Sequence, residues 1–134
     1  YQAADASTGW ALEAGEMTHG DDNVTNGVDN YLISPLLDCT ELSSASVSFV
    51  EYQTFIIDWY DFHGVYYSED YDGMNRETAT WVELQNGSAP LNEPTVRVYE
   101  IPTTTTAIAW RYMGDYADNW FIDDVVVGET LSTN

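Results

Sequence analysis

Two adjacent carboxylates near the end of the chain, Asp123 and Asp124, are the residues whose type and spacing suggest chemistry most directly. They lie in the run 120–127, which is rich in β-branched and aromatic residues and predicts a strand. A carboxylate buried in a strand is costly unless a cation or hydrogen-bond donors satisfy it. In one interpretation the pleat sends one carboxylate to solvent, and Arg111 or a backbone N–H satisfies the other. In the other interpretation, one of them is a ligand of a structural Ca²⁺, which prefers oxygen ligands.

Acidic residues elsewhere offer further ligands. The polar loop predicted at 15–30 contains Asp22 and Asp29, although solvated carboxylates are the commoner finding in such a loop. Asp70 and Asp72 lie in a predicted turn whose D-x-D-G order resembles part of a calcium loop, and a plain hairpin turn explains that order equally well. We expect the ion at the strand, because only a buried pair needs compensation. The candidate metal ligands are Asp123, Asp124, Asp22, Asp29, Asp70 and Asp72.

A segment that combines aromatic rings with carboxylates, 58–63, is the second candidate site. Rings stack on the apolar C–H faces of a sugar, while carboxylates accept hydrogen bonds from its hydroxyl groups. We predict an exposed loop that binds a glycan, with Tyr52 and Tyr66 as further contacts. The alternative is that Trp59 or Phe62 folds back and closes one end of the core. The candidate ligand-binding residues are Asp58, Trp59, Tyr60, Asp61, Phe62 and His63.

The sequence indicates no enzyme. His19 and His63 have neither a recognisable nucleophile nor an HExxH motif beside them. Cys39 is the only cysteine, which excludes an internal disulfide and favours a structural thiol. Carboxylates are so numerous that a pair at the spacing used by glycosidases would carry no information.

The charge of the chain restricts its partners. Among 134 residues there are 23 acidic side chains, three arginines and no lysine, which gives a formal net charge of −20. Nucleic acids and anionic membranes both require basic patches, so we expect neither as a partner. The charge favours divalent cations, neutral partners or a marine or saline medium that screens repulsion. The chain begins at Tyr1 with no signal peptide, so we expect a mature fragment or an excised domain. It has no membrane-spanning run, so we expect no insertion in a membrane. We also expect a monomer.

Short stretches of alternating polarity, separated by turn residues, predict strands and no helix. We predict a hairpin made of 108–112 and 120–127, with a turn at 114–119, and place Trp81, Trp110 and Trp120 in the core. The pattern predicts one all-β domain, 1–134, built as a two-sheet antiparallel β-sandwich of the jelly-roll type. The predicted strands are 10–13, 31–34, 45–57, 65–68, 79–84, 95–101, 108–112 and 120–127.

Several of these segments also carry a family resemblance. Seven short motifs lie at 31–35, 47–49, 65–68, 70–73, 79–81, 108–112 and 120–125. Their order and spacing resemble the bacterial cleaved adhesin and choice-of-anchor J domains, which are similar to the adhesin modules of gingipains and more distantly to MAM domains. The chain departs from the pattern at its beginning, where only Asp5 precedes Trp10, so a metal ligand from that strand is missing or replaced.

The resemblance implies a β-jelly roll that is stabilised by Ca²⁺, belongs to a secreted or cell-surface bacterial protein and has no chemistry of its own. Two function classes remain open. One is a carbohydrate-binding or adhesive module that recognises a polysaccharide or other glycan. The other is a structural or protein-interaction domain that packs against adjacent domains of its parent protein and binds no free ligand.

Overall fold

The computed structural model describes residues 2–3, 10–13, 16–19, 28–53, 60–85, 93–114 and 120–130, and these residues form an all-β protein. Within these ranges no segment is helical, and no helix is therefore long and apolar enough to cross a membrane. The strands are β1 (Gln2–Ala3), β2 (Trp10–Glu13), β3 (Glu16–His19), β4 (Val28–Ile33), β5 (Ala45–Gln53), β6 (Tyr60–Ser68), β7 (Trp81–Gln85), β8 (Thr95–Ile101), β9 (Ala107–Gly114) and β10 (Trp120–Glu129).

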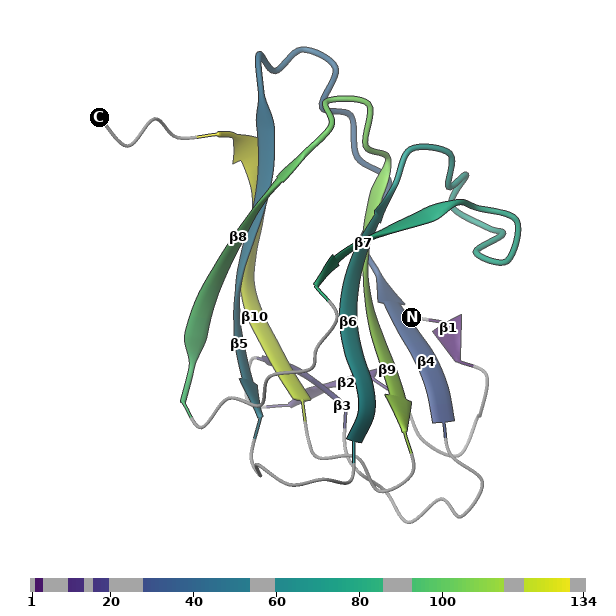
Figure 1. Ribbon diagram of the computed structural model, residues 1–134, viewed down its shortest axis with the longest axis vertical. Coiled ribbons are helices and arrows are strands. Elements are labelled where there is room, and N and C mark those ends of the chain that lie inside the picture. Colours follow the sequence, from purple (N-terminus) through teal and green to yellow (C-terminus); the bar gives the residue numbers. More distant parts are fainter. Residues whose placement is uncertain are drawn as a thin grey trace.

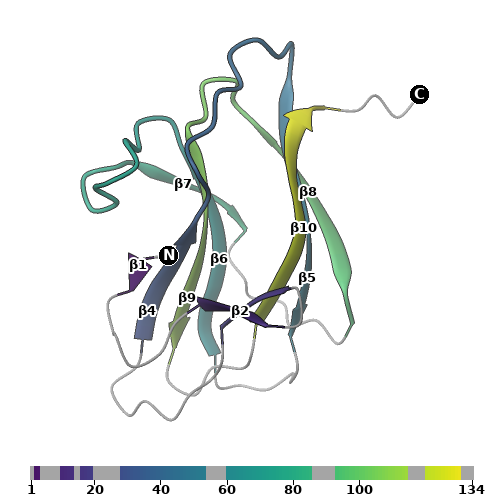
Figure 2. The same cartoon turned by 180° about the vertical axis from the view of Figure 1, so that it is seen from behind.

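The strands form two antiparallel sheets that pack face to face. Sheet A has the order β1-β4-β9-β6-β7, and sheet B has the order β2-β3-β10-β5-β8. In Figure 1, sheet A lies on the right and the long strands of sheet B on the left; Figure 2 shows the same two layers from behind. The predicted antiparallel β-sandwich is therefore confirmed.

The predicted hairpin at the end of the chain is wrong. β9 pairs with β4 and β6 in sheet A, whereas β10 pairs with β3 and β5 in sheet B. β10 alternates in burial as expected near its start, whereas Ala107 and Ala109 on the other face of β9 are also buried. The two strands turn their large apolar side chains toward each other across the core. Alternation reports that a strand has one buried face and does not report which strand lies beside it.

The core lies between the two inner faces. On β5, Val47 and Phe49 are almost completely buried, and on β9 the same holds for Ile108 and Trp110. The Phe49 ring meets the Trp110 ring edge to face, with 5.5 Å between ring centroids and an interplanar angle of 86°. This geometry is favourable for aromatic quadrupoles and joins the two sheets near the centre of the core.

A carboxylate that the sequence did not single out, Glu51 on β5, is buried in this core with 1% of its surface exposed. Arg97 on β8 donates from Nε to Oε2 of Glu51 over 2.9 Å, and Trp120 on β10 donates from Nε1 to Oε1 over 3.1 Å. Both carboxylate oxygens thus have a donor, one of them charged. The contact connects three adjacent strands of sheet B through a single side chain.

The predicted buried carboxylate pair is not buried. Between Asp123, which lies opposite Val50, and Val126, which lies opposite Ser48, the pairing of β10 with β5 shifts by a bulge. Asp124 at this bulge has φ +52° and is exposed, while Asp123 is half-buried on the outer side of the sheet. Aspartate tolerates the left-handed region better than most residues, and the extra residue lets both acids avoid the core. Arg111, suggested as their partner, lies in sheet A.

The Glu51 contact generates a stability prediction. We expect Glu51→Ala to lower the free energy of unfolding by about 3 kcal/mol, because it removes the buried carboxylate that accepts from Arg97 Nε and Trp120 Nε1. Glu93→Ala, at an exposed glutamate, is the matched control and should change it by less than about 0.5 kcal/mol. Urea unfolding measures both values. Equal losses in the two variants would contradict a stabilising role for the contact.

Candidate functional site

The outer face of sheet A carries an unusual group of aromatic and charged side chains, which we call the aromatic face. On β9, Ile108, Trp110 and Tyr112 belong to the core, so Ala109 and Arg111 point the other way. Strand register places partners from the neighbouring strands on the same outer face. The aromatic face consists of Tyr31 on β4, Ala109 and Arg111 on β9, Tyr66 on β6, and Trp81 and Glu83 on β7.

The chain between β6 and β7 folds onto this face. Tyr71 from this connection is 6% exposed, and its ring centroid lies 5.4 Å from that of Trp81. Trp81 also packs toward Tyr31, with 6.4 Å between centroids, and its Nε1 donates to the backbone carbonyl of Arg76 over 3.0 Å. The sequence predicted Trp81 in the central core, and this prediction is wrong. Trp81 is a half-buried member of a second, smaller cluster outside sheet A.

Two of the three arginines of the chain meet at one ring of this cluster. The guanidinium carbon of Arg76 lies 4.5 Å from the centroid of the Tyr31 ring, and that of Arg111 lies 5.1 Å from it. Such cation–π contacts are favourable, the more so when they are partly desolvated. Arg76 also forms an ion pair with the exposed Glu77 at 3.9 Å, which contributes little. The aromatic face is thus the place where this acidic chain concentrates positive charge.

Asp70 and Asp72, candidate metal ligands, act as acceptors that shape the connection. Oδ1 of Asp70 accepts from the backbone N–H of Thr80 over 2.7 Å and from the Ser68 hydroxyl over 2.9 Å. Oδ1 of Asp72 accepts from the N–H groups of Met74 and Asn75, each over 2.9 Å. These hydrogen bonds hold the pKa of both carboxyl groups below the ordinary aspartate value. The plain-turn interpretation accounts for both residues without a cation.

The other candidate metal ligands are separated. Asp123 faces outward from sheet B with Asp124 beside it, whereas the backbone of Asp29 lies in β4 of sheet A. Asp22 and the side chain of Asp29 lie outside the described residues. Across the described ranges no group of three or more histidine, cysteine or acidic side chains is placed to hold a metal ion.

The aromatic segment predicted as a loop is partly a strand. The backbone of Tyr60, Asp61, Phe62 and His63 lies in β6, between β9 and β7, while Asp58 and Trp59 and the side chains of 60–63 lie outside the described residues. The strand forms because the segment continues directly into 64–68, whose inward residues fill the core.

The two tyrosines named with this segment are not brought together. Tyr66, further along β6, lies on the aromatic face. Tyr52 lies on the outer face of sheet B, where its ring centroid is 5.3 Å from that of Phe121. The two side chains therefore occupy opposite surfaces of the sandwich.

Trp81 and Glu83 were not among the binding residues predicted from the sequence, although their spacing indicates a shared face. They are two positions apart in a strand and so share a face, and the charge of Glu83 indicates that this face is turned to solvent. Glu83 lies opposite Tyr66, and Trp81 lies diagonally from Tyr66, about 7–8 Å away in ordinary sheet geometry. Tyr66 and Trp81 are half-buried and Glu83 is exposed, so ring surface and polar groups face solvent side by side.

The lone cysteine is not poised for catalysis. Cys39 is 3% exposed. Burial raises the pKa of its thiol, and the charge of Asp38 raises it further. A reactive cysteine requires the opposite shift, so a structural role fits Cys39 better.

Comparison with known proteins shows the fold. No protein-family model and no curated protein matches the sequence. Among solved structures, the chain is similar to the K3 cleaved adhesin domain of Lys-gingipain from Porphyromonas gingivalis, with a TM-score of 0.65, 18% identity, and coverage of 96% of this chain and 91% of that one. It is also similar to the K1 domain, with a TM-score of 0.60, 16% identity, and coverage of 97% and 90%. For the K2 domain the TM-score is 0.59 and the identity 19%, with coverage of 92% of this chain and 87% of that one. The resemblance inferred from the sequence is thus confirmed for the fold.

Calcium stabilisation stays a prediction of the sequence, and the geometry sharpens its test. The hydrogen bonds of Asp70 and Asp72 account for these two acids without a cation. We propose Asp22 and Asp29, two of the ligands predicted from the sequence, as the acids to test first. Ca²⁺ at a hundredfold excess over Kd should then increase the free energy of unfolding by about 2.7 kcal/mol. The melting temperature should therefore be higher in millimolar Ca²⁺ than in chelator. Asp29→Asn should remove the shift, and Asp72→Asn should retain it. Identical melting with Ca²⁺ and with chelator, and no metal by elemental analysis, would show that the prediction is wrong.

Proposed function

We propose that this chain is a non-catalytic binding module that holds a glycan against the aromatic face of sheet A. The observation that carries the proposal is the pair of half-buried rings, Tyr66 and Trp81, beside exposed Glu83 on one face. Sugar rings present apolar C–H surfaces and hydroxyl groups together. A neighbouring ring surface and carboxylate offer a contact for each.

The packing beneath these rings supports a preformed site. Trp81 is held by its contacts with Tyr71 and Tyr31 and by its hydrogen bond to the Arg76 carbonyl. A ring that is fixed before binding loses little side-chain entropy when a ligand stacks on it. Asp70 fixes the start and the end of the same connection through Ser68 and Thr80. The site is therefore built on a rigid part of the sheet.

The candidate segment 58–63 extends this surface in our proposal. Its last four residues begin β6, and the same strand continues to Tyr66. The distance from Tyr60 to Tyr66 along an extended strand is about 20 Å, which suits a chain of several sugar units better than a single one. We propose that this segment, whose side chains lie outside the described residues, supplies the rings and carboxylates for further sugar units.

Charge and fold point to the kind of ligand and setting. A net charge of −20 opposes the approach of acidic polysaccharides even though Arg76 and Arg111 lie on the aromatic face, so we propose a neutral glycan. The similar solved structures are named as adhesin domains, which supports an adhesive module of a secreted or cell-surface bacterial protein. A protein-interaction role is the second candidate function, and exposed valines on sheet B favour it.

Affinity electrophoresis in gels that contain soluble neutral polysaccharides tests the glycan proposal. We expect a polysaccharide to retard the wild-type chain, and Tyr66→Ala to weaken that retardation at least fivefold, because a stacked ring contributes about 1 kcal/mol beyond its buried area. Tyr52→Ala removes the same kind of side chain from the opposite sheet and should leave binding unchanged.

Trp59→Ala completes this test. The variant should lose binding and keep its melting temperature, whereas a large loss of stability would show that Trp59 closes the core. If no neutral polysaccharide retards the wild type, or if Tyr66→Ala and Tyr52→Ala weaken binding equally, the aromatic face is not a glycan site.

A further inference from the structure

The outer face of sheet B exposes apolar side chains to solvent, and we call it the valine face. On the edge strand β8, Val96 and Val98 are 66% and 62% exposed. On β10, Val125 and Val126 are 44% and 61% exposed. Single exposed apolar residues need no explanation, but strand register places Val96, Val98 and Val126 on the same outer face, where they form a patch of the kind that marks interaction surfaces.

The valines border a trough. Strand register places Val98, Ser48 and Val126 in one row across β8, β5 and β10, and Glu100, Ser46 and Gly128 in the next. The small side chains of the serines make a low floor between the valine walls, which are about 10 Å apart because two strand spacings separate them. The resulting hollow has a volume of about 310 Å³, and Glu129 and Thr130 also line it. Gly128 has no side chain that would fill the trough, and the space above it is open, because a Cβ there would meet nothing within 4 Å.

The bulge in β10 contributes to this surface. In a regular strand, consecutive residues point to opposite sides, so Val125 and Val126 would not both be exposed. The extra residue at Asp124, with its left-handed backbone, makes the exposure of both possible. Bulges of this kind redirect side chains, and backbone strain is retained where it serves a purpose.

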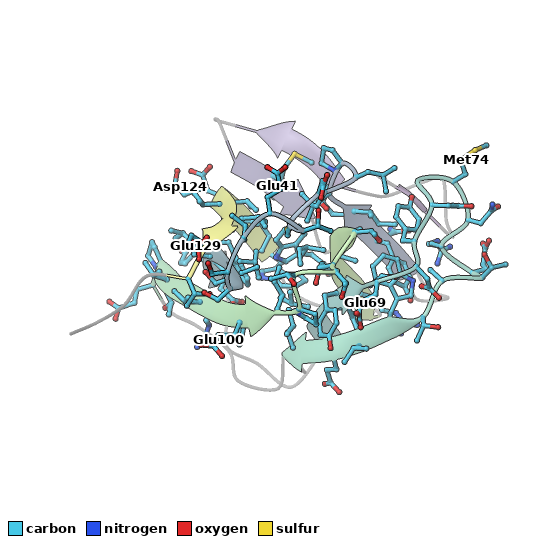
Figure 3. All side chains as sticks on the ribbon, turned by 90° about the horizontal axis from the view of Figure 1, so that it is seen from above. Glu41, Glu69, Met74, Glu100, Asp124 and Glu129 are labelled. Atoms are coloured by element: carbon cyan, nitrogen blue, oxygen red, sulfur yellow. The ribbon has the colours of Figure 1, made fainter. Side chains whose placement is uncertain are left out.

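Among the described residues, the charged side chains around the trough are all acidic. Arg76 and Arg111 lie at Tyr31 on the other sheet, and Arg97 is bound to Glu51, so no arginine or lysine of the chain lies on the valine face. Seen from above, Asp124, Glu129 and Glu100 lie on the side of sheet B, away from Glu69 and Met74 (Figure 3). A ligand for this face must therefore combine apolar groups with positive charge. A second copy of a chain with net charge −20 does not meet this requirement.

We propose that the valine face is a docking surface for a basic amphipathic segment of another protein or protein domain. The apolar ridge of the segment lies in the trough over Ser46 and Ser48, and lysine or arginine side chains on its flanks pair with Glu100 and Glu129. This surface is on the opposite side of the sandwich from the aromatic face, so the inference does not depend on glycan binding. The two surfaces can be occupied at once.

The test uses a fluorescently labelled leucine–lysine amphipathic helical peptide as the probe and anisotropy as the readout. We expect the wild-type chain to bind it and to ignore the matched leucine–glutamate peptide. Val98→Asp should weaken binding at least tenfold relative to Val82→Asp, which adds the same charge at an exposed valine of sheet A. The comparison separates contact at the trough from the general attraction of a cation to an acidic protein.

A second variant keeps the test valid if Val98→Asp is poorly folded. Ser48→Gln fills the floor of the trough without a change of charge and should weaken binding to a similar extent. The proposal is overturned if the wild type fails to bind the lysine peptide or if Val98→Asp and Val82→Asp bind it equally. It is also overturned if sedimentation shows a wild-type dimer that Val98→Asp dissociates, because the face would then be an interface between copies.

Discussion

The buried contact of Glu51 with Arg97 and Trp120 is the constraint on which sheet B depends. A carboxylate with 1% exposure is tolerated only because both oxygens have donors, at 2.9 and 3.1 Å. The donors come from β8 and β10, on either side of β5, so the contact fixes which residues of these three strands point inward. Once Arg97 points into the sandwich, its neighbours Val96 and Val98 must point out. The exposure of Val96 and Val98 is therefore a consequence of how the core satisfies one charge.

Positive charge is scarce in the whole molecule, and the position of each cation therefore matters. With three arginines and no lysine, each cation has a distinct place. Arg97 neutralises Glu51, while Arg76 and Arg111 flank the Tyr31 ring and help to hold the connection between β6 and β7 on sheet A. The two outer faces thus differ in chemistry: one combines rings with charges of both signs, and the other combines valines with carboxylates. This difference is the physical basis for assigning different partners to them.

The sequence predicted the elements of this fold better than their arrangement. Alternation located most of the strands, because burial of one face is a local pattern. It did not reveal that β9 and β10 lie in different sheets, since pairing depends on contacts distant in the chain. Asp123 and Asp124 were predicted as a buried pair, yet Asp123 lies on the outer side of the sheet and Asp124 is exposed at a bulge. The buried acid that requires partners is Glu51, in an ordinary alternating strand. The position of Trp81 in a strand favoured the core, although Glu83, on the same face of that strand, indicates a surface position.

The most direct test of two independent binding faces is amide chemical-shift mapping by NMR, with a neutral polysaccharide and a leucine–lysine peptide titrated separately and then together. The account predicts that the polysaccharide shifts the amides of Gly64, Tyr66 and Ala109 in sheet A, and that the peptide shifts those of Ser46, Ser48 and Val98 in sheet B. Each set should be unchanged by the presence of the other ligand. Shifts of one shared set of residues by both ligands, or displacement of one ligand by the other, would contradict it.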